Sequence, residues 1–253
     1  MKTVRPMFFL TVLILIVGLA CGLSGGGGDA PAPPQDTQVP PQDTQVPPQQ
    51  IEPTPVPPPT ETPAPLMYFT EEFDQDPGWR YFLTYGNESK TTYEFKNSSM
   101  TFDLEDLNSY AYYIYEQNTY DDVRIDIRAE NRGKNNNNVS LVCRLTDEGW
   151  YEFSTEGGGL WYLYAVTYNS ANEVVYSVID NGGALALKQG KEINEYGMIC
   201  KGNEITLIIN DKEIKKVKEN KYSFRDGNVG FNISSLNVTP IIVEVDWFKI
   251  SEP

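Results

Sequence analysis

The chain has 253 residues and a formal net charge of −15, with 35 acidic against 20 basic residues. This acidity argues against a nucleic-acid partner, because binding to phosphates needs a basic surface. Histidine is absent, which excludes histidine-based general-base catalysis, the usual serine and cysteine triads, and histidine-ligated metals. Any catalysis would therefore rest on carboxylates, Tyr, Lys or Arg, and carboxylate-only sites are typical of glycosidases and of calcium binding.

Residues 1–21 have the pattern of a bacterial lipoprotein signal peptide. Lys2 and Arg5 precede an uncharged apolar run over 7–20, too short to span a membrane but long enough for a signal-peptide core. The run ends in Val-Gly-Leu-Ala before Cys21, which resembles the lipobox whose cysteine is lipidated, although Gly18 stands where that family prefers Leu. We expect export and a lipid on Cys21 that anchors the protein to the outer face of a bacterial cell membrane. The alternative is an ordinary cleaved signal peptide with an incidental cysteine.

Residues 22–66 are predicted to be a disordered, proline-rich linker. Most of the 18 prolines lie between Pro31 and Pro65, and the seven-residue unit over 33–39 recurs over 40–46. Such a composition cannot bury a core and favours polyproline II, so the segment is expected to be a semi-rigid stalk. A docking site for a proline-recognising domain is the alternative.

Residues 67–253 are predicted to form one all-β domain, a two-sheet antiparallel β-sandwich, because short β-branched and aromatic runs recur between turn residues. Val123, Ile125 and Ile127 alternate with charged residues, the pattern of a strand with one dry face. Three runs over 139–164 read as a meander, with Cys143, Leu145, Tyr151 and Phe153 facing inward. In chain order the other expected elements are strands at 67–73 and 79–82, a hairpin over 92–95 and 99–104, a pair over 110–116 and 121–129, a hairpin over 166–179, strands at 196–201, 204–209 and 213–218, and strands at 229–234 and 241–250.

The three cysteines leave one intramolecular pair if Cys21 carries lipid. Cys143 and Cys200 both lie in predicted strands, and export favours their oxidation. A disulfide between them is therefore expected. The alternative is two buried free thiols in adjacent strands.

Several motifs in this order resemble the concanavalin A-like lectin/glucanase superfamily, in its laminin-G-like and 3-keto-disaccharide hydrolase-like branches. They are Phe-Asp-Gln-Asp-Pro-Gly-Trp at 73–79, Ser-Leu-Val-Cys-Arg at 140–144, Trp-Tyr-Glu-Phe at 150–153, the run over 203–211, Gly-Asn-Val-Gly-Phe at 227–231, and the run over 243–250. The resemblance covers most of 69–250. It implies a jelly roll that binds glycans on its concave sheet. Such domains are often found on bacterial lipoproteins.

The resemblance also suggests ligand-binding residues. In the hydrolase-like branch an Arg and a Glu line the pocket, and Arg144 and Glu152 stand at similar places; strand alternation puts both on the face opposite Cys143. Trp161, Tyr112 and Trp150 are candidate platforms for sugar rings. The alternatives are an exposed salt bridge of little energetic value and aromatic residues that fill the core.

Two carboxylate patterns are further candidate sites. Glu244-Val245-Asp246 resembles part of the Glu-x-Asp-x-x-Glu motif of family-16 glycoside hydrolases, but Lys249 replaces the third carboxylate, so a structural strand is favoured over retaining glycosidase chemistry. Asp74 and Asp76, with Asp246, are candidate ligands of a structural calcium ion. The alternative is an Asx-type turn without metal.

The sequence therefore favours a stalked, lipid-anchored and monomeric binding module for glycan or another surface polymer. A sugar-processing hydrolase that uses Arg144 and Glu152 is the second hypothesis. The third is a structural envelope lipoprotein without a ligand.

Overall fold

A computed structural model describes residues 66–253, and every element below lies in that part of the chain. Its strands are β1 (Phe69–Glu71), β2 (Arg80–Tyr85), β3 (Thr91–Phe95), β4 (Met100–Leu104), β5 (Tyr110–Tyr115), β6 (Val123–Asn131), β7 (Asn137–Thr146), β8 (Gly149–Glu156), β9 (Leu160–Tyr168), β10 (Val174–Gly183), β11 (Ile193–Lys201), β12 (Glu204–Ile209), β13 (Lys212–Lys218), β14 (Asn228–Ser235) and β15 (Ile241–Ser251). One 3-10 turn, η1 (Glu88–Lys90), precedes β3. The predicted leader, Cys21 and the proline-rich linker lie outside the described residues.

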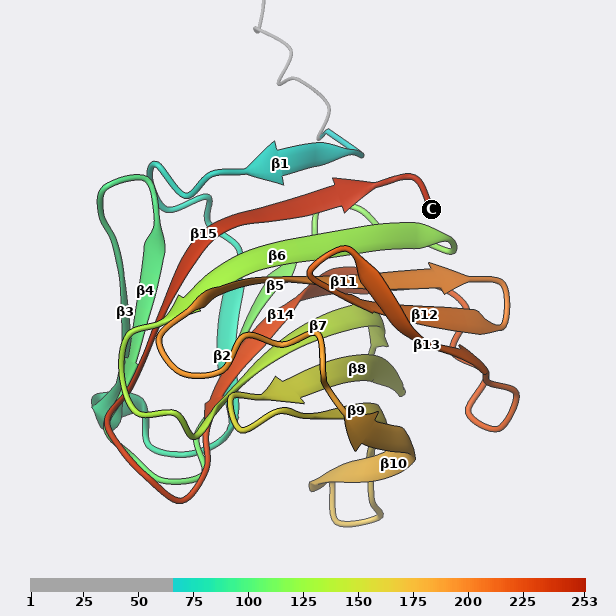
Figure 1. Ribbon diagram of the computed structural model, residues 1–253. Helices are drawn as coiled ribbons and strands as arrows, with labels where there is room; N and C mark the ends of the chain where they lie inside the picture. Colours follow the sequence, from blue (N-terminus) through green and yellow to red (C-terminus); the bar gives the residue numbers. More distant parts are fainter. Residues whose placement is uncertain (1–65) are drawn as a thin grey trace, which may run out of the picture. The chain divides into compact units, whose positions relative to one another are not determined.

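The strands form two antiparallel sheets packed face to face (Figure 1). The first, sheet A, has the order β13-β12-β11-β6-β15-β4-β3, with β1 added on β15, and the second, sheet B, has the order β10-β9-β8-β7-β14-β5-β2. The all-β sandwich expected from the sequence is confirmed. Apolar side chains from both inner faces make one large core, because alternation along each strand sends every second residue inward.

Several local predictions are confirmed by the pairing of strands. β3 and β4 form the expected hairpin, β7, β8 and β9 form the meander, and β9 and β10 form the hairpin that turns near Asn169. Between β12 and β13, Asn210 and Asp211 both have positive φ angles of 47° and 62°, the conformation of a tight two-residue hairpin turn. β6 alternates strictly between buried and half-buried residues, as its sequence period predicts.

One predicted pairing is wrong. The runs over 110–116 and 121–129 were expected to pair, but β5 lies in sheet B between β14 and β2, whereas β6 lies in sheet A between β11 and β15. Both strands are apolar on their inner faces, and the segment between them crosses from one sheet to the other. Closeness in sequence therefore does not make them neighbours in a sheet.

The chain enters the domain beside its own C-terminal strand. β1 pairs with β15 through three residue pairs, from Phe69 with Ile250 to Glu71 with Phe248 (Figure 1). The segment before β1 is also held by side chains from the end of β5 and from the β5–β6 connection: Tyr115 Oη donates to the Leu66 carbonyl at 2.9 Å, and Tyr120 Oη to the Met67 carbonyl at 2.6 Å. Side chains and backbone pairing therefore fix the start of the domain together.

Sheet B is strongly curled. If its seven strands lay in a flat sheet, the edge strands β2 and β10 would be about 29 Å apart, which is six inter-strand spacings of about 4.8 Å. Instead, Thr84 Oγ1 of β2 lies 2.9 Å from Tyr176 Oη of β10, and Tyr85 Oη donates to the Val174 carbonyl at 2.8 Å. The end of β2 and the start of β10 therefore meet over the outer face of the sheet, which makes that face concave.

Candidate functional site

The concave face of sheet B carries most of the polar and aromatic residues that could meet a ligand. On β8, Tyr151 and Phe153 pack into the main core, so Trp150, Glu152 and Ser154 project onto the opposite face. The same alternation on β14 and β5 brings Asn232 and Tyr112 to that face. Neighbouring strands thus place these side chains side by side without any long loop.

Glu152 is the centre of the concave face. Its carboxylate accepts hydrogen bonds from Tyr112 Oη at 2.7 Å, from Trp150 Nε1 at 3.1 Å and from Asn232 Nδ2 at 3.2 Å. The residue is 2% exposed, and no ion pair among residues 66–253 involves it. Burial raises the pKa of Glu152 above its ordinary value, although these hydrogen bonds oppose the rise. Glu152 is therefore an unpaired buried acid that orients three neighbours from three strands.

A tyrosine of the edge strand extends over this centre. Tyr176 Oη lies 2.6 Å from Tyr112 Oη and 2.9 Å from Thr84 Oγ1. Since Tyr112 donates to Glu152, the hydroxyl protons can run in one direction, from Thr84 through Tyr176 and Tyr112 to Glu152. This chain connects β2, β10, β5 and β8 across the concave face.

One half of the concave face is filled by a second apolar cluster. Tyr112 stacks on Phe82 with ring centroids 4.9 Å apart and contacts Trp150 edge to face at 5.5 Å. The buried members of the cluster are Tyr112, Ile114, Val142, Leu145, Trp150 and Val166. This half is closed to solvent by its own side chains.

The other half has a polar floor and an aromatic wall. The floor consists of small hydroxyl and amide side chains from β7, β8 and β14, namely Asn138, Ser140, Ser154, Asn232 and Ser234, all buried. Asn138 Oδ1 has no hydrogen-bond partner among residues 66–253. The wall is formed by Tyr162 and Tyr164 of β9, both partly exposed and stacked with centroids 5.5 Å apart and planes at 13°. Glu156 stands at the end of β8 on the same face, where burial raises its pKa.

Arg144 does not lie on this face, so the predicted pairing of Arg144 with Glu152 is wrong. The registers of β7 with β8 and with β14 both shift around Arg144, whose φ is 57°. Such a bulge breaks the alternation from which the prediction was made. Gly227 completes this local geometry, because its φ is 150° and an added Cβ would lie 2.6 Å from the Arg144 carbonyl carbon.

The guanidinium of Arg144 is used structurally at one end of the sandwich. It donates to the backbone carbonyls of Asp121 (2.8 and 3.0 Å), Gly202 (2.8 Å) and Phe224 (3.0 Å), and the side chain is 2% exposed. Burial lowers the pKa of Arg144. Three separate chain segments thus depend on one side chain.

The predicted aromatic platforms are also placed differently. Tyr112 and Trp150 do share the concave face with Glu152, but they are 0% and 1% exposed, because Phe82 and Tyr176 cover them. Trp161 points to the opposite side and packs in the main core with Leu163. Leu145, expected to face inward with Cys143, joins the second cluster because of the same bulge.

The expected disulfide is present. Cys143 and Cys200 are bonded across the core and join β7 of sheet B to β11 of sheet A.

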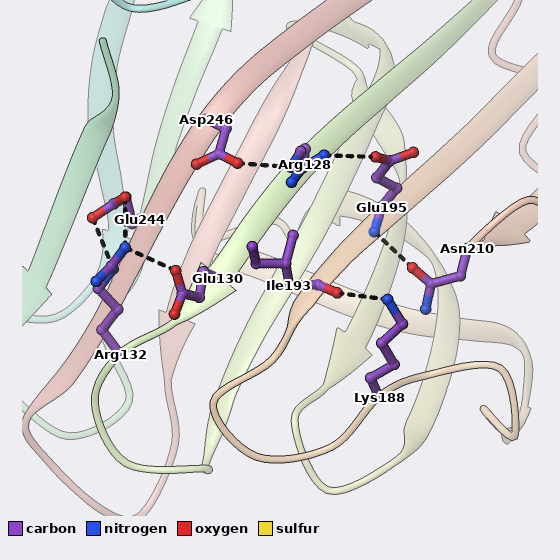
Figure 2. Close-up of polar contacts among 9 residues, drawn as sticks. All are labelled: Arg128, Glu130, Arg132, Lys188, Ile193, Glu195, Asn210, Glu244 and Asp246. Atoms are coloured by element: carbon purple, nitrogen blue, oxygen red, sulfur yellow. Dashed lines mark hydrogen bonds and ion pairs between the residues drawn. The ribbon is translucent and has the colours of Figure 1, made fainter. Parts of the chain in front are cut away.

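The outer face of sheet A carries a network of partly exposed ion pairs (Figure 2). Arg128 of β6 contacts Asp246 of β15 at 2.7 Å and Glu195 of β11 at 3.3 Å, and Arg132 contacts Glu130 and Glu244 at 2.8 Å each. A hollow of about 820 Å³ lies beside Arg128, under the segment 185–192. The ion pairs of this network are partly exposed, so each contributes little, and no aromatic side chain lines the hollow. The concave face is therefore the stronger candidate.

This placement also bears on the two carboxylate patterns. Glu244 and Asp246 face Arg132 and Arg128 on the outer side of sheet A, away from the concave face. Asp76 accepts hydrogen bonds from Tyr113 Oη and from the Gly78 amide, both at 2.8 Å, which is the Asx-type turn. Within residues 66–253, Asp74, Asp76 and Asp246 do not make a group that could hold a metal ion. The residues present therefore do not fit the calcium site considered from the sequence.

Four residues of the concave face were not predicted from the sequence, namely Tyr176, Asn138, Tyr162 and Tyr164. Tyr176 belongs to an edge strand whose sequence gives no sign that it reaches across the sheet. Asn138 falls just before the predicted meander over 139–164, whereas it is the second residue of β7. The alternation of Trp161 and Leu163 with Tyr162 and Tyr164 was a usable signal, because two tyrosines two residues apart share one strand face.

The fold defined by these sheets is a concanavalin A-like jelly roll, as solved structures show. The domain is similar to a Bacillus subtilis protein of unknown function with a galectin-like fold, at 10% identity and a TM-score of 0.56, over 74% of this chain and 98% of that one. It is also similar to a glycoside hydrolase family 16 endo-glucanase from Bacteroides ovatus, at 10% identity and a TM-score of 0.53, over 72% and 99% of the two chains. A third is a β-1,3-1,4-glucanase (lichenase) derived from a mouse hindgut metagenome, at 11% identity and a TM-score of 0.52, over 74% and 100%.

At these identities the likeness shows the fold alone. No family model and no curated protein matches the sequence. Within the described part of the chain, none of the helical structure is long and apolar enough to cross a membrane.

Proposed function

We propose that the domain binds carbohydrate through the polar half of the concave face of sheet B. The observation that carries this proposal is the unpartnered Asn138 Oδ1 on a buried floor of amides and hydroxyls, next to the stacked Tyr162 and Tyr164. A buried polar atom without a partner is costly, and a ligand hydroxyl would satisfy it. Sugars combine hydroxyl groups with apolar C–H faces, so a polar floor beside aromatic rings suits both.

The fold supports this ligand class by analogy. Two of the similar structures are an endo-glucanase and a lichenase, and another is a variant of LamA from Z. galactanivorans in complex with laminaritriose and laminaritetraose. Laminari-oligosaccharides and mixed-linkage glucans are therefore sensible first probes.

Binding is favoured over hydrolysis by the arrangement of carboxylates. The hydrolase hypothesis requires Arg144 and Glu152 to share one site, but the two side chains lie in different places. Glu152 and Glu156 do share one face of β8, but positions four residues apart on a strand are separated by about 13 Å of backbone, and retaining glycosidases need carboxyl groups about 5–5.5 Å apart. Glu152 is moreover turned toward Trp150 and Tyr112.

We also propose that this domain is displayed as a monomer at the outer face of a bacterial cell membrane, on a proline-rich stalk anchored by lipid at Cys21. The support is the lipobox-like sequence and the composition of residues 22–66. Metabolic labelling with a radioactive fatty acid tests the anchor, since Cys21→Ser should abolish labelling. Normal labelling of that variant would contradict the anchor.

The binding proposal is tested with the purified full chain on an array of neutral and charged glycans that includes linear β-1,3- and mixed-linkage gluco-oligosaccharides. Asn138→Ala and Tyr162→Ala should each weaken binding about tenfold, which corresponds to about 1.4 kcal/mol. Glu244→Gln on the outer face of sheet A is the matched control and should leave binding unchanged. Release of reducing ends would indicate hydrolysis, and absence of binding to every glycan would favour a structural lipoprotein.

A further inference from the structure

A second, smaller hollow adjoins the one beside Arg128 on the outer face of sheet A. Its volume is about 200 Å³, and the two hollows share Glu195 and Asp211 in their walls. Gly197 of β11 lines the smaller hollow without a side chain, and a Cβ at that position would lie only 2.6 Å from Asp126 Oδ1. Together the two form one joined hollow, which extends from β15 across β6 and β11 to the β12–β13 turn.

A bulge in β15 brings Trp247 to this hollow. Val245 pairs with Ala129 and the next pair is Trp247 with Arg128, so Asp246 is an extra residue between them. Strand alternation alone would put Asp246 and Trp247 on opposite faces, but a bulge re-aims the side chains around it. Asp246 contacts Arg128 at 2.7 Å on the outer face (Figure 2), and Trp247 lines the smaller hollow on that same face.

Trp247 is the most exposed of the four tryptophans. It is half-buried, whereas Trp79, Trp150 and Trp161 are 9%, 1% and 5% exposed. An indole ring beside a hollow offers a flat apolar surface and an N–H donor. These are the two features that the C–H face and the hydroxyl groups of a sugar ring need.

The charged groups around the joined hollow leave ammonium groups in excess. Both of its arginines, Arg124 and Arg128, are paired with carboxylates. Four lysines and two carboxylates that line it make no ion pair among residues 66–253, namely Lys188, Lys191, Lys212, Lys249, Glu192 and Asp211. In a chain with 35 acidic and 20 basic residues, such a surface is set apart, and it favours an anionic ligand.

We propose that the joined hollow binds an anionic saccharide, with Trp247 against a sugar ring and Lys188 and Lys212 beside its anionic groups. The site is separate from the one on the concave face, since it belongs to the other sheet and takes a different ligand. Trp247 on β15 lies two strands from Glu195 on β11, which is about 10 Å. The larger hollow, of about 820 Å³, has the size of a ligand pocket, so the joined hollow has room for more than one sugar ring.

The test pairs each acidic oligosaccharide with an uncharged counterpart and uses the purified full chain. An oligogalacturonate is compared with its methyl ester, and a sulfated galacto-oligosaccharide with its unsulfated parent. Acrylamide quenching of tryptophan fluorescence reports chiefly on Trp247, because the other three tryptophans are buried. We expect an acidic probe to protect Trp247 at a concentration at least about tenfold lower than its uncharged counterpart, equivalent to about 1.4 kcal/mol. The protection should weaken as salt is added. Lack of protection by both acidic probes, or equal protection by charged and uncharged probes, would overturn the proposal.

Variants then assign the contacts by calorimetry. Trp247→Ala should weaken binding of the acidic probe about tenfold, and the double variant Lys188→Gln with Lys212→Gln should weaken it about tenfold and reduce its salt dependence. Lys134→Gln is the matched control, because Lys134 is exposed but lines neither hollow. Circular dichroism checks the fold. If Trp247→Ala does not fold, the exposed lysines still decide, since unchanged affinity and salt dependence in the double variant would overturn the proposal.

Asn138→Ala separates this site from the concave face. That variant should leave binding of the acidic probe unchanged, although it should weaken binding of neutral glycans. The proposed function and the second site can therefore fail independently. An equal loss of acidic-probe binding in Asn138→Ala would place the anionic saccharide on the concave face and overturn the second site.

Discussion

Replacing Arg144 with Lys tests whether this residue is structural. The variant keeps the positive charge but loses the planar fork, so a single ammonium group must replace a guanidinium that reaches the carbonyls of Asp121, Gly202 and Phe224. We expect it to lose at least two of these three carbonyl partners. A hydrogen bond from a charged donor contributes about 1.5–3 kcal/mol, so the loss should be at least about 3 kcal/mol.

For a domain of this size, 1 kcal/mol lowers the Tm by about 2–4 °C, so a loss of about 3 kcal/mol should lower it by about 6–12 °C. The assay is thermal and urea unfolding followed by circular dichroism. Arg132→Lys is the matched control. Arg132 contacts two carboxylates, but its side chain is 49% exposed. That control should cost less than about 1 kcal/mol. Equal losses in the two variants would refute the structural role assigned to Arg144.

Two further predictions concern the interior. Replacing both Cys143 and Cys200 with Ala opens a loop of 57 residues and should lower the free energy of unfolding, measured in urea, by about 4 kcal/mol. A loss below about 1 kcal/mol would contradict the chain-entropy model. A wild-type mass that does not rise by two hydrogens on reduction would contradict the disulfide. Because the folded-state pKa of Glu152 is raised, its contribution to stability is fully present below its unfolded pKa and is lost as pH rises through the folded value. Glu152→Gln should remove that decline in urea unfolding measured from pH 4 to pH 8, and an unchanged pH dependence would show that another group is responsible.

Local patterns in the sequence predict much of this fold. The alternation in β6, the hairpins β3–β4 and β9–β10, and the turn at Asn210 and Asp211 depend on residues close together in the chain. The disulfide follows from the number of cysteines and the expectation of export. These features need no knowledge of which strands are neighbours.

The site could be predicted only in part, because it depends on pairing between distant strands. Glu152, Tyr112 and Trp150 were placed correctly on one face by alternation, but their burial arises from Tyr176, which is 64 residues beyond Tyr112. Arg144 was misplaced because the bulge in β7 is made where the backbone of Gly227, far along the chain, approaches it. Neither contact can be predicted from residues that are close together in the sequence.

The pairing of β1 with β15 also determines how the domain would carry mechanical tension. If the chain is pulled through its N-terminal segment, the load enters at β1, which joins sheet A through only three residue pairs, together with the side-chain contacts of Tyr115 and Tyr120 to Leu66 and Met67. These contacts can break one after another at low force. The concave face belongs to sheet B, whereas β1 belongs to sheet A. Detachment of β1 would therefore lengthen the tether by a few residues and leave the concave face of sheet B in place.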